Sequence, residues 1–162
     1  MTPASEARKN DLGDSAFPDD FRDFIRALNE SGVEYLLVGG YAVGMYGHVR
    51  ATSDIDFFYH RTLENVQRLV AAIRKFGAPE YLIDANHLAT ADAVTAFGAP
   101  PTRIDLLASI SGVDFEQAQA DAVYLDIAGE RLAVIGLASL RANKRASGRK
   151  KDRDDLKRLP PA

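Results

Sequence analysis

The chain has 162 residues, of which 46 % are hydrophobic and 27 % are charged, and its formal net charge is −3. This length and composition predict one globular domain, and the net charge argues against general polyanion binding. The sequence has no cysteine, which excludes disulfides and thiolate metal sites. No apolar run approaches the ~20 residues of a membrane span, and residues 1–15 lack the apolar segment of a signal peptide, so a reduced cytoplasmic setting is expected.

Periodicity and turn residues divide the first half of the chain. Residues 1–16 are expected to form a disordered arm, and one domain is expected over 17–160. Asp19 or Asp20 is expected to cap the first helix. The predicted elements are, in order, a helix over 19–30 ended by Gly32, a strand over 33–38, a short helix over 41–46, a strand over 54–59 and a helix that carries Val66, Leu69 and Ile73 and ends at Gly77.

The second half begins with a weaker pattern. Asp114 and Gln117 are spaced as a capping box at the start of a helix, and the turn over 128–130 predicts a hairpin. The expected elements are, in order, short strands and loops over 80–100, a strand over 103–107, a helix over 115–122, hairpin strands over 123–127 and 131–135, and helices over 137–146 and 152–159.

Asp54 and Asp56, in the predicted strand over 54–59, carry the strongest chemical signal. A strand turns both carboxylates to one face, about 7 Å apart along the backbone. Two anions this close repel each other unless a cation lies between them. Mg²⁺ fits because it takes one or two carboxylates and completes its shell with water and substrate phosphate. The alternative is a surface strand with two solvated acids.

The glycine pair Gly39-Gly40 lies between a predicted strand and a predicted helix. Open backbone N–H groups and the helix dipole favour an anion there, and glycine lets a phosphate approach the main chain closely. The alternative is a tight turn. Neither a Walker loop nor Rossmann glycine spacing is present.

Asp105 lies among apolar neighbours in the predicted strand over 103–107. An unpaired charge at such a position is costly. It is therefore expected either to form a salt bridge with Arg103 or Arg50, or to act as a third metal ligand or as a base for a hydroxyl proton.

Lys144 lies seven residues after Leu137 and four after Leu140, on the apolar face of the predicted helix. It either snorkels from the helix end or points inward at a triphosphate. Cations crowd this part of the chain, which is either a solvated face or a cradle for phosphates or an RNA acceptor. They are Lys144, Arg145, Arg149, Lys150, Lys151 and Arg153.

The histidines and serines do not predict a competing site. His48, His60 and His87 lack zinc-site spacing, and His60 is either a surface residue or a phosphate contact. Ser109 and Ser111 have no histidine partner at a meaningful spacing, which argues against hydrolase chemistry.

Taken together, four motifs resemble a known family over residues ~20–160. They look like a minimal nucleotidyltransferase of the polymerase-beta type, and most resemble the AbiEii-like group, some members of which are toxins of toxin–antitoxin systems. Many relatives carry Gly-Ser where this chain has Gly39-Gly40, so backbone amides and Tyr41 or Lys144 are expected to replace the serine contact. The motifs are Val38-Gly39-Gly40, Arg50-x-Thr52-x-Asp54-x-Asp56, Arg103-Ile104-Asp105-Leu106-Leu107, and Lys144 with Arg149 and Asp152.

The resemblance implies an α/β (α+β) palm, with a small mixed sheet flanked by helices. It implies Asp54, Asp56 and Asp105 as the catalytic residues, which hold two Mg²⁺ ions, with an NTP as substrate and Asp105 on the acceptor side. Lys144 would neutralise the departing pyrophosphate. The nucleotide-binding residues that it implies are Gly39, Gly40, Arg50, Thr52, Lys144 and Asp152.

Two classes of function follow. The first is a Mg²⁺-dependent nucleotidyltransferase that moves an NMP to a hydroxyl of an RNA end, a protein or a small molecule, with a toxin paired with an antitoxin as one form of it. The second is a nucleotide- or partner-binding module of the same fold with weak or lost catalysis. No membrane partner is expected.

Overall fold

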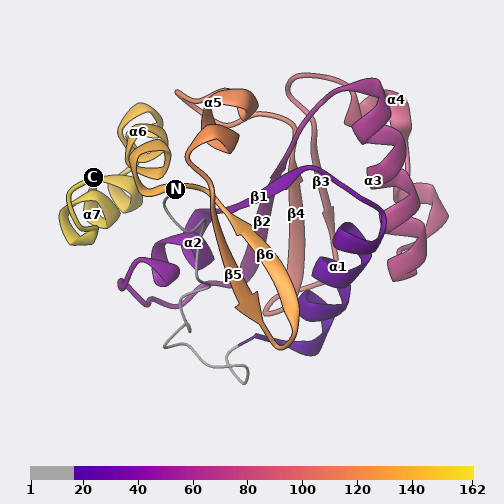
Figure 1. Ribbon diagram of the computed structural model, residues 1–162, viewed down its shortest axis with the longest axis horizontal. Coiled ribbons are helices and arrows are strands. Elements are labelled where there is room, and N and C mark those ends of the chain that lie inside the picture. The colour runs from indigo at the N-terminus through magenta and orange to yellow at the C-terminus, as the bar shows by residue number, and fades with distance from the viewer. Residues whose placement is uncertain (1–16) are drawn as a thin grey trace, which may run out of the picture.

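One mixed sheet organises the fold, which we describe from a computed structural model for residues 17–162; the predicted arm over 1–16 lies outside the described residues. Within this range six strands are ordered β3-β4-β2-β1-β6-β5 (Figure 1). The predicted mixed sheet flanked by helices is confirmed. The strands are β1 (Tyr35–Val38), β2 (Asp54–Tyr59), β3 (Val94–Phe97), β4 (Arg103–Leu107), β5 (Val123–Ile127) and β6 (Glu130–Val134).

Helices flank the sheet on both sides. In Figure 1, α1 and α3 lie on one side, and α2, α6 and α7 lie on the opposite side. The helices are α1 (Asp19–Glu30), α2 (Gly39–Met45), α3 (Leu63–Phe76), the 3₁₀ helix η2 (Glu80–Leu82), α4 (Ala85–Leu88), α5 (Phe115–Ala120), α6 (Leu137–Ser147) and α7 (Lys150–Arg158).

The central strand β2 sets the register of the acidic residues. It pairs with β1 in antiparallel and with β4 in parallel orientation, so that Asp56 lies opposite both Val38 and Asp105. Paired residues on neighbouring strands share a face, and residues two apart along a strand do so as well. The three acids of β2 and β4 therefore lie on one face of the sheet.

Alternation along β2 sends its two phenylalanines to opposite faces of the sheet. Phe57 turns away from the acids and packs against Phe24 of α1, with ring centroids 5.5 Å apart. Phe24 also packs against Phe76 and Phe97 at 5.3 and 5.4 Å. Phe58 points to the acidic side and meets Phe115 of α5 at 5.2 Å. The helices α1 and α3 thus close a continuous hydrophobic core on one face.

Three helix starts differ from the sequence predictions. The short helix α2 begins two residues before the predicted start. The first helix begins at Asp19, but its N-cap is Pro18 and no side chain caps it, so the predicted aspartate cap is wrong. Asp19 and Asp20 instead lie in the first turn, where the helix dipole favours negative charge. The last helix begins at Lys150, two residues earlier than predicted, which places Asp152 within its first turn.

The turns also differ in detail. The hairpin loop is the two residues Ala128 and Gly129, with φ of 51° and 82°, which is the backbone of a tight two-residue turn; Glu130 belongs to the strand. Between 80 and 100 the chain forms η2, α4 and a single strand rather than several short strands. Elements of three or four residues are too short to leave a periodic signal.

Candidate active site

A cavity of about 620 Å³ lies on the acidic face, beside β1, β2, β4 and α6. Its volume is within the usual range for small-molecule sites. It brings together all but one of the residues predicted for the site; Asp152 is not among the lining residues. Those that line the cavity are Gly39, Gly40, Arg50, Thr52, Asp54, Asp56, Asp105 and Lys144.

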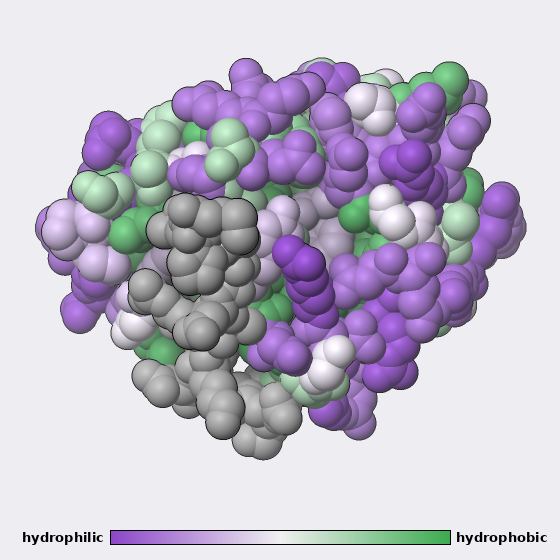
Figure 2. All heavy atoms as spheres, viewed as in Figure 1, coloured by the Kyte–Doolittle hydropathy of each residue, from purple (hydrophilic) through white to green (hydrophobic). Residues whose placement is uncertain are grey.

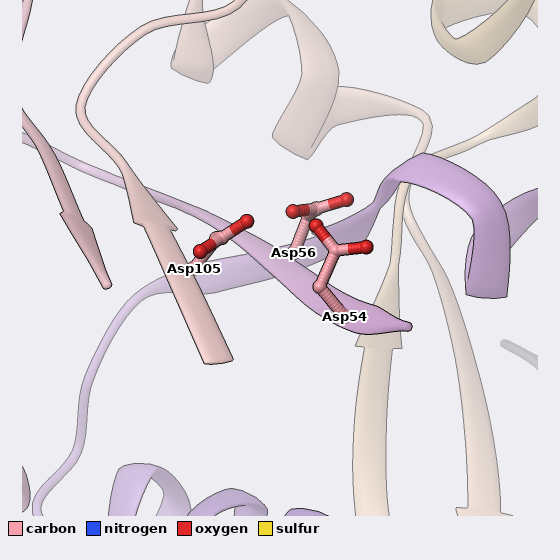
Figure 3. A group of neighbouring side chains, drawn as sticks. All are labelled: Asp54, Asp56 and Asp105. Atoms are coloured by element: carbon pink, nitrogen blue, oxygen red, sulfur yellow. The ribbon is translucent and has the colours of Figure 1, made fainter. Parts of the chain in front are cut away.

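Three carboxylates converge in this cavity. Asp54 and Asp56 project from β2 and Asp105 from β4, and their carboxylate groups turn toward one another (Figure 3). One oxygen from each lies within 4.8 Å of the others. Clustered carboxylate oxygens are the donors that hard divalent cations such as Mg²⁺ prefer. The donor set therefore fits such an ion.

The electrostatics of the triad are those of crowded like charges. Burial, together with the charges of Asp54 and Asp105, raises the pKa of Asp56 to about 7. Burial and the neighbouring Asp54 also raise the pKa of Asp105, although Arg103 opposes this. Arg103 donates from Nε to Asp105 at 2.8 Å, so the salt-bridge alternative for Asp105 is confirmed, while its carboxylate still belongs to the triad.

Gly39 is required by the close approach of β2. Its φ is +70°, and a Cβ at this position would collide with the Asp56 carboxylate. Only glycine meets both requirements, because it adopts a positive φ readily and has no Cβ. The main chain of α2 therefore reaches the triad directly, and the glycine pair opens the helix instead of forming a separate turn before it.

Two of the predicted nucleotide contacts are already engaged by the protein. The Thr52 hydroxyl donates to the main-chain oxygen of Asp54 at 3.0 Å. The Tyr41 ring packs against Phe17 and Phe21 at 5.2 and 5.5 Å, and Tyr41 is not among the residues that line the cavity. Tyr41 is therefore poorly placed to replace a serine.

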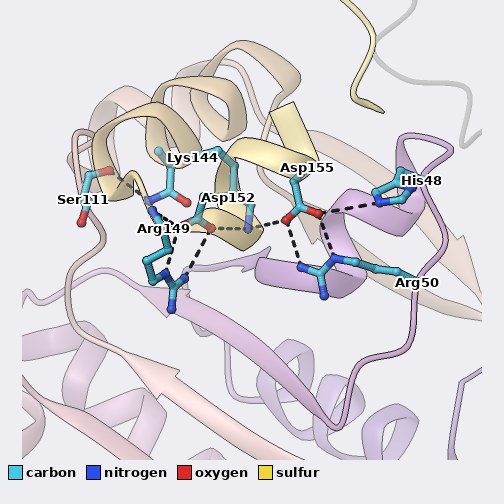
Figure 4. A network of polar contacts seen from close by, with 8 residues as sticks. His48, Arg50, Ser111, Lys144, Arg149, Asp152 and Asp155 are labelled. Atoms are coloured by element: carbon cyan, nitrogen blue, oxygen red, sulfur yellow. Dashed lines mark hydrogen bonds and ion pairs between the residues drawn. The ribbon is translucent and has the colours of Figure 1, made fainter. Parts of the chain in front are cut away.

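Lys144 is buried, as its position on the helix predicted, with 4 % of its surface exposed. Its Nζ lies 3.2 Å from Asp152 and 3.1 Å from Asp155 (Figure 4). Arg149 also pairs with Asp152, and Arg50 with Asp155, at 2.8 and 2.9 Å. Lys144 lines the cavity, but its charge is shared with two carboxylates of α7.

These partners determine the protonation of the α7 carboxylates. Burial alone would raise the pKa of Asp152, but hydrogen bonds from Arg149 and Lys144 hold it well below the usual range. For Asp155 burial is likewise outweighed, because Arg50 and Lys144 lower its pKa. Both side chains are about 1 % exposed. They are buried anions held ionised by the cations around them.

Sequence reasoning missed Asp155. Its spacing of three residues from Asp152 places both on one face of a helix, and that spacing could have identified the pair. Also missed were the lining residues Ser109, Ser111 and Asn143; the last donates its amide to the Ser111 carbonyl at 3.0 Å.

His60 has a different role from the phosphate contact considered for it. Its Nδ1 lies 2.5 Å from Glu34 and its Nε2 lies 2.8 Å from Glu116. Its ring stacks on Phe115 with centroids 4.7 Å apart. Both ring nitrogens are therefore occupied by carboxylates, and His60 anchors α5 to the end of β2.

The face of the molecule seen in Figure 2 is mostly polar. Hydrophilic residues cover most of the face seen in Figure 2, with apolar residues in small separate patches. Among the helices of residues 17–162, none has the length and apolar character needed to cross a membrane.

Comparison with known proteins adds one finding. A family described as nucleotidyl transferase of unknown function (DUF2204) matches residues 18–161. A search of curated proteins found no match.

Proposed function

This chain belongs to the nucleotidyl transferase family described above, and we propose that it is a divalent-metal-dependent nucleotidyltransferase. The reaction would move an NMP from an NTP to a hydroxyl acceptor and release pyrophosphate. The observation that carries the proposal is the convergence of three carboxylates within 4.8 Å, in a cavity that is also lined by Arg50, Lys144, Arg149 and Lys151. Anionic metal ligands beside a cationic wall suit a metal-bound polyphosphate.

Asp54, Asp56 and Asp105 would hold Mg²⁺, because they supply oxygen donors and their mutual repulsion lacks a sufficient counter-charge. When bound, the metal would stabilise charge on the transferring phosphoryl group and favour the acceptor alkoxide. Asp105 is the ligand proposed to face the acceptor, and its raised pKa suits a group that takes a hydroxyl proton.

The other residues would bind and orient the nucleotide. Gly39 and Gly40 allow the main chain to approach the phosphates. Lys144 and Arg149 would offset the charge that develops on the departing pyrophosphate. In the transfer step the acceptor oxygen forms a bond to the α-phosphorus, the bond to pyrophosphate breaks, and the hydroxyl proton leaves to a carboxylate. Asp152 would act indirectly, by fixing Lys144 and Arg149.

The acceptor is a separate part of the proposal. An RNA end, a protein hydroxyl and a small-molecule hydroxyl are the classes to be tested, and a toxin role with a cognate antitoxin is the biological form drawn from the AbiEii-like resemblance. The competing proposal is a nucleotide-binding module without catalysis. One observation favours it, since the Lys144 ammonium is paired with carboxylates.

The test is pyrophosphate release from each NTP with Mg²⁺, in the presence of total RNA, protein or small-molecule hydroxyl acceptors. Mass spectrometry then identifies the labelled acceptor. Asp54→Asn should abolish release, while Asp92→Asn, which changes an exposed acid, should not. Metal-dependent NTP binding without release from any acceptor would favour the binding module, and full release by the Asp54 variant would reject the carboxylate site.

A further inference from the structure

Arg50 connects the cavity to the C-terminal helix α7. Its Nε donates to Asp155 Oδ1 at 2.9 Å and its Nη2 donates to Oδ2 at 3.0 Å (Figure 4). A bidentate pair of this kind fixes the plane of the guanidinium, and the Asp155 side chain that fixes it is 1 % exposed. The orientation of Arg50 in the cavity wall is therefore set by a residue 105 positions away.

The remaining guanidinium nitrogen, Nη1, has no acceptor among residues 17–162. It is buried, and no hydrogen-bond partner for it occurs in the part of the chain that the structure describes. Leaving a buried donor of a charged group unpaired is costly, and such atoms are rare in folded proteins unless a water, an ion or a ligand supplies the partner. Nη1 of Arg50 therefore marks a position for an oxygen that is not part of the described chain.

Gly40 forms the wall next to this nitrogen. A Cβ at position 40 would lie 3.0 Å from Arg50 Nη1 and 3.1 Å from Thr52 Oγ1. The Thr52 hydroxyl already donates its hydrogen to the Asp54 main-chain oxygen. Of these two side chains, Arg50 is therefore the one whose N–H can donate to a ligand. Gly40 and Arg50 both line the cavity. Nη1 itself is covered in the ligand-free chain, so contact with a ligand requires this wall to move, and glycine at position 40 keeps a side chain out of the space next to Nη1.

The charges around Arg50 suit an anion. Arg50 and Lys144 share Asp155, while Lys144 and Arg149 share Asp152. Three cations thus share two carboxylates, and one positive charge in this network is uncompensated. All three cations line the cavity, and so do the three triad carboxylates. The excess positive charge of the network therefore offsets part of the negative charge of the triad, and directed N–H donors rather than net charge would hold a polyphosphate there.

We propose that Asp155 is a positioning residue for a polyphosphate subsite. Its carboxylate turns Arg50 so that Nη1 faces the wall at Gly40, where it donates to a phosphate oxygen of the ligand. The inference deepens the proposed function and rests on it only for the identity of that ligand as an NTP. The subsite itself is built from protein groups alone, so it should hold inorganic tripolyphosphate without a metal, although more weakly than with one, because the triad carboxylates of the same cavity then repel the ligand.

The test is calorimetric titration of tripolyphosphate, in EDTA, into the full chain and its variants. Arg50→Lys keeps the charge but loses the directed N–H, so binding should weaken about tenfold. Asp155→Asn should weaken it to a similar extent. The double variant should be no weaker than either single one, because both act through the same N–H. Asp154→Asn, the exposed neighbour on α7, is the matched control and should stay within about twofold of wild type.

Several results would overturn the proposal. They are wild-type affinity in Arg50→Lys, additive losses in the double variant, or tighter binding by Asp155→Asn, which would mean that Asp155 competes with phosphate. If the Asp155 variant does not fold by circular dichroism, Gly40→Ala decides, because its Cβ crowds Nη1 while Asp155 is intact. This variant should bind tripolyphosphate more weakly, and unchanged affinity would refute the subsite.

The same titration separates this inference from the proposed function. If the wild type does not bind tripolyphosphate in EDTA, the subsite is wrong even where pyrophosphate release occurs. If the wild type binds it with the expected variant pattern but no acceptor is ever labelled, the subsite stands and the transferase proposal fails.

Discussion

The two faces of the sheet are stabilised in opposite ways. Under α1 and α3, Phe24, Phe57 and Phe97 pack ring against ring, and their burial contributes directly to folding. On the other face, Asp56 lies among like charges, and Lys144 is buried with its carboxylate partners. Buried ion pairs add little net stability. The aromatic face therefore stabilises the fold, and the acidic face is left free to be arranged for binding.

The largest effect on the acidic face is expected from Asp56→Asn. On the proposed function, transfer should fall by about 1,000-fold or more, which corresponds to roughly 4 kcal/mol of transition-state stabilisation. The melting temperature of the metal-free protein should nevertheless rise, because the charge that crowds Asp54 and Asp105 is removed. Pyrophosphate release and thermal unfolding in EDTA measure the two effects. A lower melting temperature would show that the triad stabilises the empty fold.

The complementary substitution on the aromatic face is Phe24→Ala, which should change stability and not activity. It should cost about 3–5 kcal/mol of unfolding free energy, the usual loss for a buried phenylalanine. Denaturant unfolding measures the loss, and turnover per folded molecule should be unchanged well below the melting temperature. A fall in turnover at full folding would mean that the two faces are coupled more tightly than their packing indicates.

Much of this arrangement could be predicted from the sequence. The bounds of β2 and β4 were correct because alternation and apolar runs are local signals. The burial of Lys144 followed from helical spacing. The pairing of Arg50 with Asp155 could not be predicted, since a contact between residues 105 apart leaves no periodic trace. The wrong cap at Asp19 arose because Pro18 already supplies a helix start without a side-chain acceptor.

The ion-pair network offers a change of intermediate size. Lys144→Met removes the cation shared by Asp152 and Asp155. Breaking a buried pair from one side leaves uncompensated charge, so about 3 kcal/mol of unfolding free energy should be lost. Lys150→Met, at an exposed position of α7, is the control and should change stability by less than about 0.5 kcal/mol. Equal effects of the two variants would mean that the network contributes nothing specific to folding.

The pH dependence of the metal-free protein tests the triad with a smaller effect. Asp56 has a folded pKa of about 7, above the ordinary value of about 4. Between these values the folded state binds more protons than the unfolded state, so this group's contribution to stability falls as pH rises from 4 to 7. We expect a melting temperature about 2–4 °C lower at pH 8 than at pH 5.5. Asp56→Asn should flatten that difference, and Mg²⁺ should raise the melting temperature more at pH 8 than at pH 5.5.

The smallest effect is expected at His60, which joins the acidic face to α5. Burial alone would lower its pKa, but the hydrogen bonds with Glu34 and Glu116 outweigh this, so the pKa is raised. A raised histidine pKa gives stability that is fully present below the unfolded value of about 6.5 and is lost as pH rises through the folded value. Because Glu116 is 71 % exposed, solvent screening limits the gain to about 0.5–1 kcal/mol.

The variant that tests this is His60→Gln, with His87→Gln at an exposed position as the control. Denaturant unfolding at pH 5.5 and pH 9 gives the free energies. The difference in unfolding free energy between the wild type and the His60 variant should be about 0.5–1 kcal/mol larger at pH 5.5 than at pH 9, because only the charged imidazole attracts both carboxylates. The loss of ring stacking on Phe115 contributes equally at both pH values. The His87 variant should follow the wild type throughout. A difference between wild type and His60→Gln that does not change with pH would assign His60 to packing alone, and the acidic face would then meet α5 through Phe115 rather than through charge.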